Sequence, residues 1–437
     1  MRKFLKQTGY YLSALLKWLM FAAVTGVLCG IVGSAFHVGV AKATALRTQY
    51  PWLLFFLPAA GLLIVATYKI MHTEGQGTND IISAVSSGKK VSILLIPSIF
   101  IGTVLTHLCG GSAGREGAAL QMGGGIGYHV GRLFRMDERD IRMATMCGMG
   151  AFFSALFGTP LAATMFAIMV VSVGVLYHAA FIPCFTASMI SYGVSLLIGV
   201  KPTRFLVAAP SVTVEMMARV MLLGALCALV SILFCNAIHK AEHVLKEKIK
   251  NPWIRIVLGG AIVIVLSLLS GTADYNGAGM DVIARAIEEG SARPEAFLLK
   301  ILLTAITLGA GYKGGEVVPS FFVGAVFGCA VSPSLGIPAG FGAAVGLVSV
   351  FCGATNCPIS SIFLSIELFG SDGILFFAMA SGISYILSGY NGLYSSQKIL
   401  YSKIKAQYIN VRTNSHEAGN LDDIEQTEWQ PGQKDGK

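Results

Sequence analysis

Residues 110–127 read Gly110-Gly-Ser-Ala-Gly-Arg-Glu-Gly-Ala-Ala-Leu-Gln-Met-Gly-Gly-Gly-Ile-Gly127, which places a charged pair among glycines. The run from Val91 to Gly114 that leads into this segment contains no Asp, Glu, Lys or Arg and is long enough to cross a bilayer. Placing a charged side chain at membrane depth costs at least about 2.5 kcal/mol of free energy, so Arg115 and Glu116 are candidates for a functional role. A glycine-rich turn that opens a helix leaves backbone N–H groups free. The segment therefore predicts a buried anion site that contains a titratable carboxylate.

The composition predicts an all-α polytopic membrane protein. Of the 437 residues, 54% are hydrophobic and only 13% are charged, which excludes an ordinary soluble protein. Uncharged runs recur along the chain, and the two longest, Met143–Val200 and Val317–Ile366, must each fold back at least once. We expect about ten or more membrane-embedded helices, many of them interrupted by Gly or Pro.

The charge distribution predicts which segments face the cytosol. The net charge is +9, and the basic residues cluster where a positive-inside bias assigns cytosolic segments, at residues 2–17, 240–250 and 398–405. We expect a cytosolic segment over residues 1–17. Residues 402–437 are expected to be a polar cytosolic tail without a core, too short for a regulatory domain. No nucleic-acid-binding motif is present, so we expect no nucleic-acid partner.

An internal repeat divides the membrane part into two halves. Three segments match later segments in the same order, at offsets of 202, 200 and 198 residues: 75–88 over 277–290, 114–116 over 314–316, and 157–166 over 355–363. This pattern is typical of transporters whose substrate site lies near the bilayer midplane between broken helices. We expect a first membrane repeat over residues 18–200 and a second over residues 201–401.

Glu116 and Glu316 occupy equivalent places in the two halves, each after a glycine at a predicted helix start. The alternative is that each carboxylate only caps its helix, which stabilises a helix by roughly 0.3–2 kcal/mol. Burial and the neighbouring Arg115 act in opposite directions on the proton affinity of Glu116, so this side chain can change charge. A carboxylate that competes with an anion for the same amides, and leaves when protonated, would be both a gate and a proton carrier.

Two further segments are candidates for the anion site. The polar loop Gly75-Gln-Gly-Thr-Asn79 offers its backbone amides and the Gln76 side chain; the alternative is a helix cap at Thr78 or Asn79. Tyr394 follows the last hydrophobic run and offers one hydroxyl donor, but interfacial anchoring is an equally common role for tyrosine.

Other chemistries find less support in the sequence. Residues 110–114 also fit the G-x-S-x-G pattern of a hydrolase with Ser112 as nucleophile, but that turn requires a preceding strand and a separate acid–His pair. The nine cysteines lie mostly in apolar runs without a Cys-x-x-Cys pair, so we expect core residues. We expect no metal and no cofactor.

Together these segments resemble the CLC family of anion channels and anion/proton antiporters, from about residue 18 to about residue 398. Residues 114–117 with Gln121 match the family motif that carries the gating glutamate, which falls on Glu116. The second-half motif Gly-Gly-x-x-x-Pro appears at residues 314–319, and the late tyrosine falls at Tyr394. The resemblance implies inverted repeats of tilted, broken helices, a homodimer with one pore in each subunit, and a multi-pass protein of the plasma membrane. It also implies anion contacts from Gln76, Gly77, Arg115, Gly117, Val317, Val318 and Tyr394.

The chain departs from the family pattern at several positions. The first anion loop usually reads Gly-Ser-Gly-Ile-Pro, so its serine and proline are both missing here. Chloride/proton exchangers also carry a second, cytosol-facing glutamate where this chain has apolar Met169 and Val170. With a glutamate at 316, these differences resemble the bacterial fluoride/proton antiporter branch. That branch typically has methionine in place of Gln76 and threonine in place of Val318.

We therefore expect a proton-coupled anion antiporter, not an enzyme, that exports fluoride from a bacterial cytoplasm in exchange for protons. Glu116 would carry the proton, and Glu316 would assist it or tune the inner end of the path. The expected partners are a small inorganic anion, protons and the lipid bilayer. A chloride or broader halide exchanger and a passive anion channel on the same fold are the alternatives.

Overall fold

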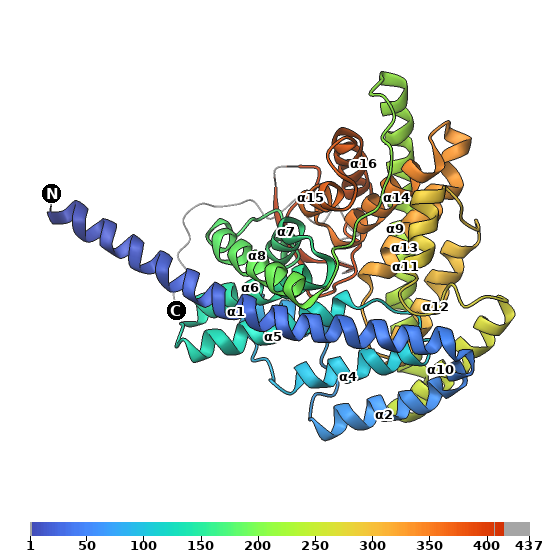
Figure 1. The fold of residues 1–437 in the computed structure, drawn as a ribbon, viewed down its shortest axis with the longest axis horizontal. Coiled ribbons are helices and arrows are strands. Elements are labelled where there is room, and N and C mark those ends of the chain that lie inside the picture. Colours follow the sequence, from blue (N-terminus) through green and yellow to red (C-terminus); the bar gives the residue numbers. More distant parts are fainter. Residues whose placement is uncertain (1, 406, 415–437) are drawn as a thin grey trace.

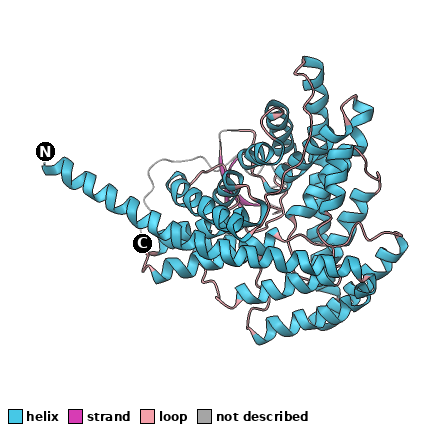
Figure 2. Cartoon of the chain, in the orientation of Figure 1, coloured by secondary structure: helices cyan, strands magenta, loops and turns pink. Residues whose placement is uncertain are grey.

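A computed structural model describes residues 2–405 and 407–414, and most of this part of the chain is helical (Figure 2). The α-helices follow in the order α1 (Arg2–Gln49), α2 (Leu57–Ile70), α3 (Thr78–Ser87), α4 (Leu95–Leu108), α5 (Glu116–Leu133), α6 (Glu138–Phe157), α7 (Pro160–Met169), α8 (Phe181–Ile198), α9 (Val214–Lys248), α10 (Pro252–Leu269), α11 (Met280–Ala284), α12 (Ala296–Ala310), α13 (Val317–Val331), α14 (Ala339–Thr355), α15 (Pro358–Phe369) and α16 (Ile374–Leu387). Three short strands are β1 (Ser172–Val173), β2 (Lys398–Tyr401) and β3 (Tyr408–Arg412).

Six of the described helical segments are long and apolar enough to cross a membrane: Gln7–Gln49, Pro51–Ile70, His178–Ile198, Val214–Lys248, Pro252–Leu269 and Val317–Leu335. Shorter apolar helices, among them α4, α7, α12, α14, α15 and α16, complete the membrane part. Large apolar side chains such as Leu197 and Leu269 are 89% and 78% exposed, which suits a surface that faces lipid. The predicted all-α, multi-pass architecture is confirmed.

The two halves pack internally in the same way. In Figure 1 the first half, blue to green, lies beside the second half, yellow to red. In the first half α5 packs along α6, and a Cβ on Gly148 would collide with the carbonyl of Gly123. In the second half α13 packs along α14, and a Cβ on Gly328 would collide with the carbonyl of Gly342. Small residues thus bring both helix pairs into backbone contact, as is common between helices in membranes.

Each half contains a helix that ends inside the protein and is followed by a new helix start. Helix α4 ends at Leu108 and α5 begins at the fully buried Glu116, while α12 ends at Ala310 and α13 begins at the fully buried Val317. The connecting turns use left-handed backbone at Gly110 (φ 81°) and Gly311 (φ 110°), a conformation that glycine adopts without a steric penalty. Both helix N-termini are therefore buried.

The structure bears on two of the predicted segments. Helix α1 runs from Arg2 to Gln49 without a break at residue 17, so residues 2–17 are continuous with the first long apolar helix. The expectation of a tail without a core is wrong for residues 402–414, because β3 pairs antiparallel with β2, and β2 pairs parallel with β1. Residues 415–437 lie outside the described residues.

Candidate functional site

The buried starts of α5 and α13 meet at two glycines. The N–H of Gly114 donates to the carbonyl of Gly315 at 2.7 Å, and the N–H of Gly315 donates back to Gly114 at 2.8 Å. A Cβ on Gly315 would collide with the backbone nitrogen of Gly117, so no larger residue fits there. The two halves of the repeat thus join through backbone alone, immediately before their glutamates.

Glu116 is the first residue of α5 and is fully buried. Its Oε2 accepts hydrogen bonds from the backbone N–H of Arg115 at 2.9 Å and from that of Val318 at 3.2 Å. Its Oε1 lies 3.7 Å from Nε of Arg115 and has no hydrogen-bond partner among the described residues. The carboxylate therefore binds N–H groups from the helix starts of both halves.

Arg115 faces a different cavity from the other predicted site residues. Its side chain lies 3.1 Å from Nδ1 of His37 and 5.9 Å from the ring centroid of Phe157. Together with Arg47 and His107, it lines a cavity of about 1210 Å³, which we call the outer cavity. The outer cavity is not lined by Glu316 or Tyr394, so the structure does not bring all predicted anion ligands to one space.

An inner cavity of about 440 Å³ collects four of the eight remaining predicted residues. The basic segment at residues 240–250, predicted to be cytosolic, contributes to the mouth of this cavity through Lys246 and Lys250. Glu116 lines neither cavity, although its neighbour Arg115 lines the outer cavity and Glu316 lines the inner one. The inner cavity is lined by Gln76, Gly77, Thr78, Gln121, Glu316 and Tyr394, among others.

The backbone amide of Gly77, in the loop before α3, is already paired. The N–H of Gly77 donates to Oδ2 of Asp80 at 2.8 Å, and the contact of this amide with an anion stays a prediction. The alternative of Thr78 or Asn79 as N-cap is wrong, because Gly77 is the N-cap of α3 and Asp80, in the first turn, accepts from its N–H. Asn79 instead accepts a hydrogen bond from the N–H of Ser396 at 3.1 Å, which ties this loop to the segment after Tyr394.

Thr78 connects α3 to α5 beside the glutamates. Its Oγ1 lies 3.4 Å from the carbonyl of Gly117 and accepts from Nε2 of Gln121 at 3.1 Å. A Cβ on Gly117 would lie 2.9 Å from Cα of Gly315 and 3.1 Å from Oε2 of Glu316. Gly117 is thus a point of close approach between the halves, which explains why the motif requires glycine there.

Glu316 and Tyr394 both present unpaired polar atoms toward the inner cavity. Glu316 is at the N-cap of α13, yet its side chain caps no backbone N–H, and its buried Oε2 has no partner among the described residues. The hydroxyl of Tyr394, a residue that is 1% exposed, is also without a partner within the described chain. Its burial does not fit an interfacial anchor. Tyr394 is held by its carbonyl, which accepts from Oγ1 of Thr413 at 2.6 Å.

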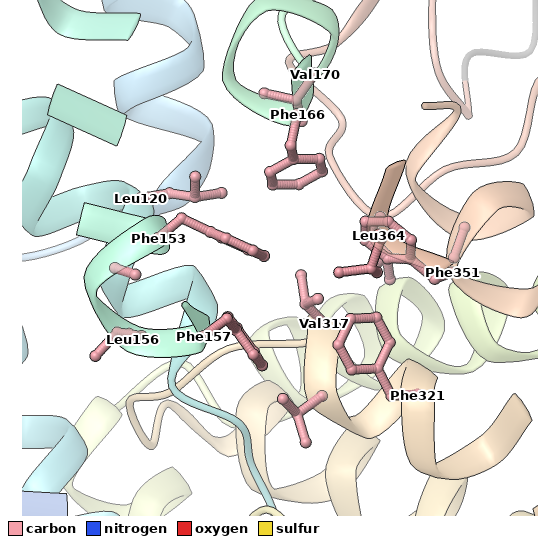
Figure 3. Packing of buried hydrophobic residues seen from close by; sticks show 14 of the residues in the cluster. Leu120, Phe153, Leu156, Phe157, Phe166, Val170, Val317, Phe321, Phe351 and Leu364 are labelled. Carbon is pink, nitrogen blue, oxygen red and sulfur yellow. The ribbon is translucent and has the colours of Figure 1, made fainter. Parts of the chain in front are cut away.

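Apolar side chains from both halves form a wall next to these helix starts. Figure 3 shows residues of α5, α6 and α7 facing residues of α13, α14 and α15 around Val317. The ring centroids of Phe157 and Phe321 are 6.0 Å apart, and those of Phe321 and Phe351 are 5.2 Å apart. Val317 and Val318 are fully buried. Glu116 is itself fully buried, and a buried environment strengthens the hydrogen bonds that its carboxylate accepts.

One charged residue was missed in the sequence analysis. Glu367, on α15, accepts from the N–H groups of Leu161 at 3.0 Å and Ala162 at 2.9 Å, and so caps α7. An offset of 198 residues places it over Met169, the position where an internal glutamate is missing. Extending the third repeat match by a few residues would have found it.

The hydrolase alternative has no assembled site. Oγ of Ser112 lies 3.0 Å from Oγ1 of Thr304, and its backbone N–H donates to Oγ1 of Thr307. His107 directs Nδ1 to its own helix, at the carbonyl of Thr103. Ser112 thus has a structural partner in the second half, and no histidine pairs with it in the part of the chain that the structure describes.

The protein has two related halves, and their buried helix starts converge on one carboxylate. This arrangement defines a multi-pass membrane transport protein with its site between broken helices.

Comparisons with known proteins name the family. The model of the voltage gated chloride channel family matches residues 59–389. The chain is 34% identical over 397 residues to a chloride/fluoride channel protein of Pseudomonas syringae pv. tomato, covering 89% of this chain and 87% of that relative. The chain belongs to the voltage-gated chloride channel family, and the resemblance to CLC proteins is confirmed.

Other relatives and solved structures agree with this assignment. The chain is 26% identical over 381 residues to the H(+)/Cl(-) exchange transporter ClcA of Vibrio campbellii, over 80% of this chain and 81% of that protein. The crystal structure of a CLC-type fluoride/proton antiporter superposes with a TM-score of 0.85 at 30% identity, covering 88% of this chain and 98% of that one. A slow cyanobacterial Cl-/H+ antiporter gives a TM-score of 0.74 at 20% identity, covering 85% of this chain and 94% of that one, which supports the fold alone.

Proposed function

We propose that the protein is a proton-coupled anion antiporter that exports fluoride from the cytoplasm in exchange for protons. One observation carries the proposal: the Glu116 carboxylate accepts from the N–H groups of Arg115 and Val318, at the starts of helices from both halves. Helix N-termini with free N–H groups are natural anion sites. The carboxylate and a transported anion would therefore compete for the same donors.

This competition couples the two ions. A negative Glu116 occupies the donors, and protonation removes its charge and weakens both hydrogen bonds. An anion then takes the vacated donors, while the neutral side chain moves with its proton. When Glu116 releases the proton on the other side, the carboxylate regains its charge and displaces the anion. Each cycle moves a proton and an anion in opposite directions.

The remaining polar groups of the inner cavity suit a small, strongly hydrated anion. Such an ion enters only where donors replace its water. The unpaired hydroxyl of Tyr394 is one donor, and the Gln76 side chain, which lines the same cavity, is another. The similarity to a chloride/fluoride channel protein and to a fluoride/proton antiporter supports fluoride as the substrate. Glu316 would assist proton transfer or tune this inner end of the path.

A chloride or broader halide exchanger is the second candidate. Gln76 and Val318 stand where the fluoride branch typically has methionine and threonine, and the ClcA relative is an H(+)/Cl(-) exchange transporter. A passive anion channel would share the fold but would lack the coupling to protons.

Anion efflux from liposomes separates these candidates. Purified protein is reconstituted, and fluoride and chloride efflux are compared with and without an imposed proton gradient. The proposal expects fluoride efflux at least several-fold faster than chloride efflux, and uphill anion movement driven by the proton gradient. Equal chloride flux would support the halide exchanger. Downhill flux without proton movement would support the channel.

The family resemblance also leads us to expect a homodimer in the plasma membrane, with a separate anion path in each subunit. Sedimentation of the detergent-solubilised protein, corrected for bound detergent, tests this expectation. A mass of one chain would contradict the dimer.

A further inference from the structure

Lys313 precedes the second-half motif directly and lines the inner cavity. Its backbone N–H donates to Oγ1 of Thr106 at 3.3 Å, which fixes the turn. The stem of the side chain lies beside α4, where a Cβ on Gly102 would be 2.9 Å from Cγ of Lys313. The ammonium lies 4.2 Å from the ring centroid of Tyr68. Gly102 thus makes room for the stem, and Tyr68 supports the charged end.

The charge of Lys313 is not neutralised within the described chain. Its side chain makes no hydrogen bond or ion pair with any described residue. Lys250 and Glu74 are solvent-exposed at the mouth. Several other charged groups in the cavity lining have partners. Lys246 pairs with Glu242 at 2.5 Å, and Asp80 pairs with Lys89 at 2.5 Å. Arg255 donates to the carbonyls of Ala310 and Ile249.

Two buried hydroxyls accompany this free cation. Tyr68 is 4% exposed and Tyr394 is 1% exposed, and the hydroxyl of each has no partner among the described residues. Both tyrosines line the same cavity as Lys313. Unpaired buried donors are costly unless a ligand or water pairs with them. A cation with two such donors in one cavity is the chemistry that recognises an anion.

An anion entering from the mouth also meets the unpaired carboxyl group of Glu316. A negative Glu316 would repel the anion, so the approach requires a compensating positive charge. Lys313, separated from Glu316 by two glycines in the chain, supplies that charge. Four acidic and four basic side chains line this cavity, so the field that an anion meets depends on which of them are paired.

We propose that Lys313 forms a capture site for a small inorganic anion in the inner cavity, separate from the helix-start amides that Glu116 occupies. The inference rests on the proposed anion transport and adds the residue that recruits the ion. Lys313 acts before the exchange step. It therefore sets the anion concentration at which transport saturates and leaves the coupling to protons unchanged.

The test compares Lys313→Met with Lys313→Arg in liposomes. Methionine keeps the stem packing without the charge, and arginine keeps the charge. Half-saturating fluoride and chloride concentrations are measured, together with the ratio of protons to anions. We expect Lys313→Met to raise the half-saturating concentration about tenfold at low ionic strength, with Lys313→Arg close to wild type. The difference should shrink when an impermeant salt is added.

Lys250→Met is the matched control, because Lys250 is a cation at the same mouth that is exposed. An effect equal to that of Lys313→Met would mean a diffuse field and would overturn the capture site. Unchanged saturation in Lys313→Met would overturn it too. A wild-type protein that moves no anion would instead refute the proposed function. Thermal unfolding of each variant in detergent identifies any loss caused by misfolding.

Discussion

The carboxylate of Glu116 accepts a hydrogen bond from the backbone N–H of Val318, 3.2 Å away and 202 residues further along the chain. Glu116 opens the helix of the first half, and Val318 lies in the first turn of the helix of the second half. An internal carboxylate therefore already fills the place between the halves where an anion would bind. Displacement of this carboxylate is the step on which the proposed exchange depends.

Gln76→Ser should shift selectivity toward chloride. The change restores the residue found in the first anion loop of chloride-handling relatives and shortens the donor that reaches the inner cavity. The measurement is the ratio of fluoride to chloride efflux rates from liposomes. An unchanged ratio would show that the Gln76 side chain does not touch the ion.

Tyr394→Phe should weaken anion binding with little change in packing. The substitution removes one unpaired buried hydroxyl and almost no volume. A hydrogen bond to a charged group contributes about 1.5–3 kcal/mol, so affinity should fall about tenfold or more. Titration calorimetry of the purified protein with fluoride measures the effect. Equal affinity of the two proteins would place the hydroxyl away from the anion.

Lys403→Met should change how stability depends on pH. Lys403 lies after α16, outside the membrane helices, and donates to Oδ1 of Asn356 at 2.5 Å, the carbonyl of Tyr385 at 2.8 Å and Oγ of Ser388 at 3.1 Å. Burial lowers the pKa of Lys403 from 10.5 to about 7. Between these two values the unfolded chain binds more protons than the folded chain. The contribution of Lys403 to stability is therefore lowest below about pH 7 and rises with pH up to about 10.5.

The measurement for Lys403 is thermal unfolding in detergent at about pH 6 and about pH 9. Wild type should gain stability relative to Lys403→Met on going to the higher pH. Lys405→Met, which removes an exposed lysine from the same hairpin, is the control and should follow wild type. Parallel pH profiles of wild type and Lys403→Met would contradict the prediction.

Much of the fold and the core of the site follow from local sequence. The uncharged runs predict the membrane helices, and the offset of about 200 residues predicts that Glu116 and Glu316 begin equivalent helices. The repeat is easy to detect around the two glutamates because glycine is required at Gly114 and Gly315, whose backbones exchange hydrogen bonds. The two family motifs include these glycines, so the family resemblance predicts the same two helix starts.

Details that depend on distant contacts were not predictable. The N–H of Gly77 is occupied because Asp80 folds back onto it, and the loop at Asn79 is held by Ser396, more than 300 residues away. The hairpin of β2 and β3 is short, and it is held because β2 also pairs with β1 and because Ile399 and Val411 pack with Val173. Such pairings leave no periodicity in the sequence.

The central claim is that Glu116 carries the proton, and Glu116→Gln tests it most directly. Glutamine keeps the shape of the side chain but cannot release a proton. Reconstituted variant and wild type are given an anion gradient, and proton movement is followed with a pH-sensitive dye. We predict that wild type pumps protons and that Glu116→Gln pumps none, with its anion flux stalled as well because a neutral side chain can no longer regain the charge that displaces the anion. Proton pumping by Glu116→Gln would contradict the account.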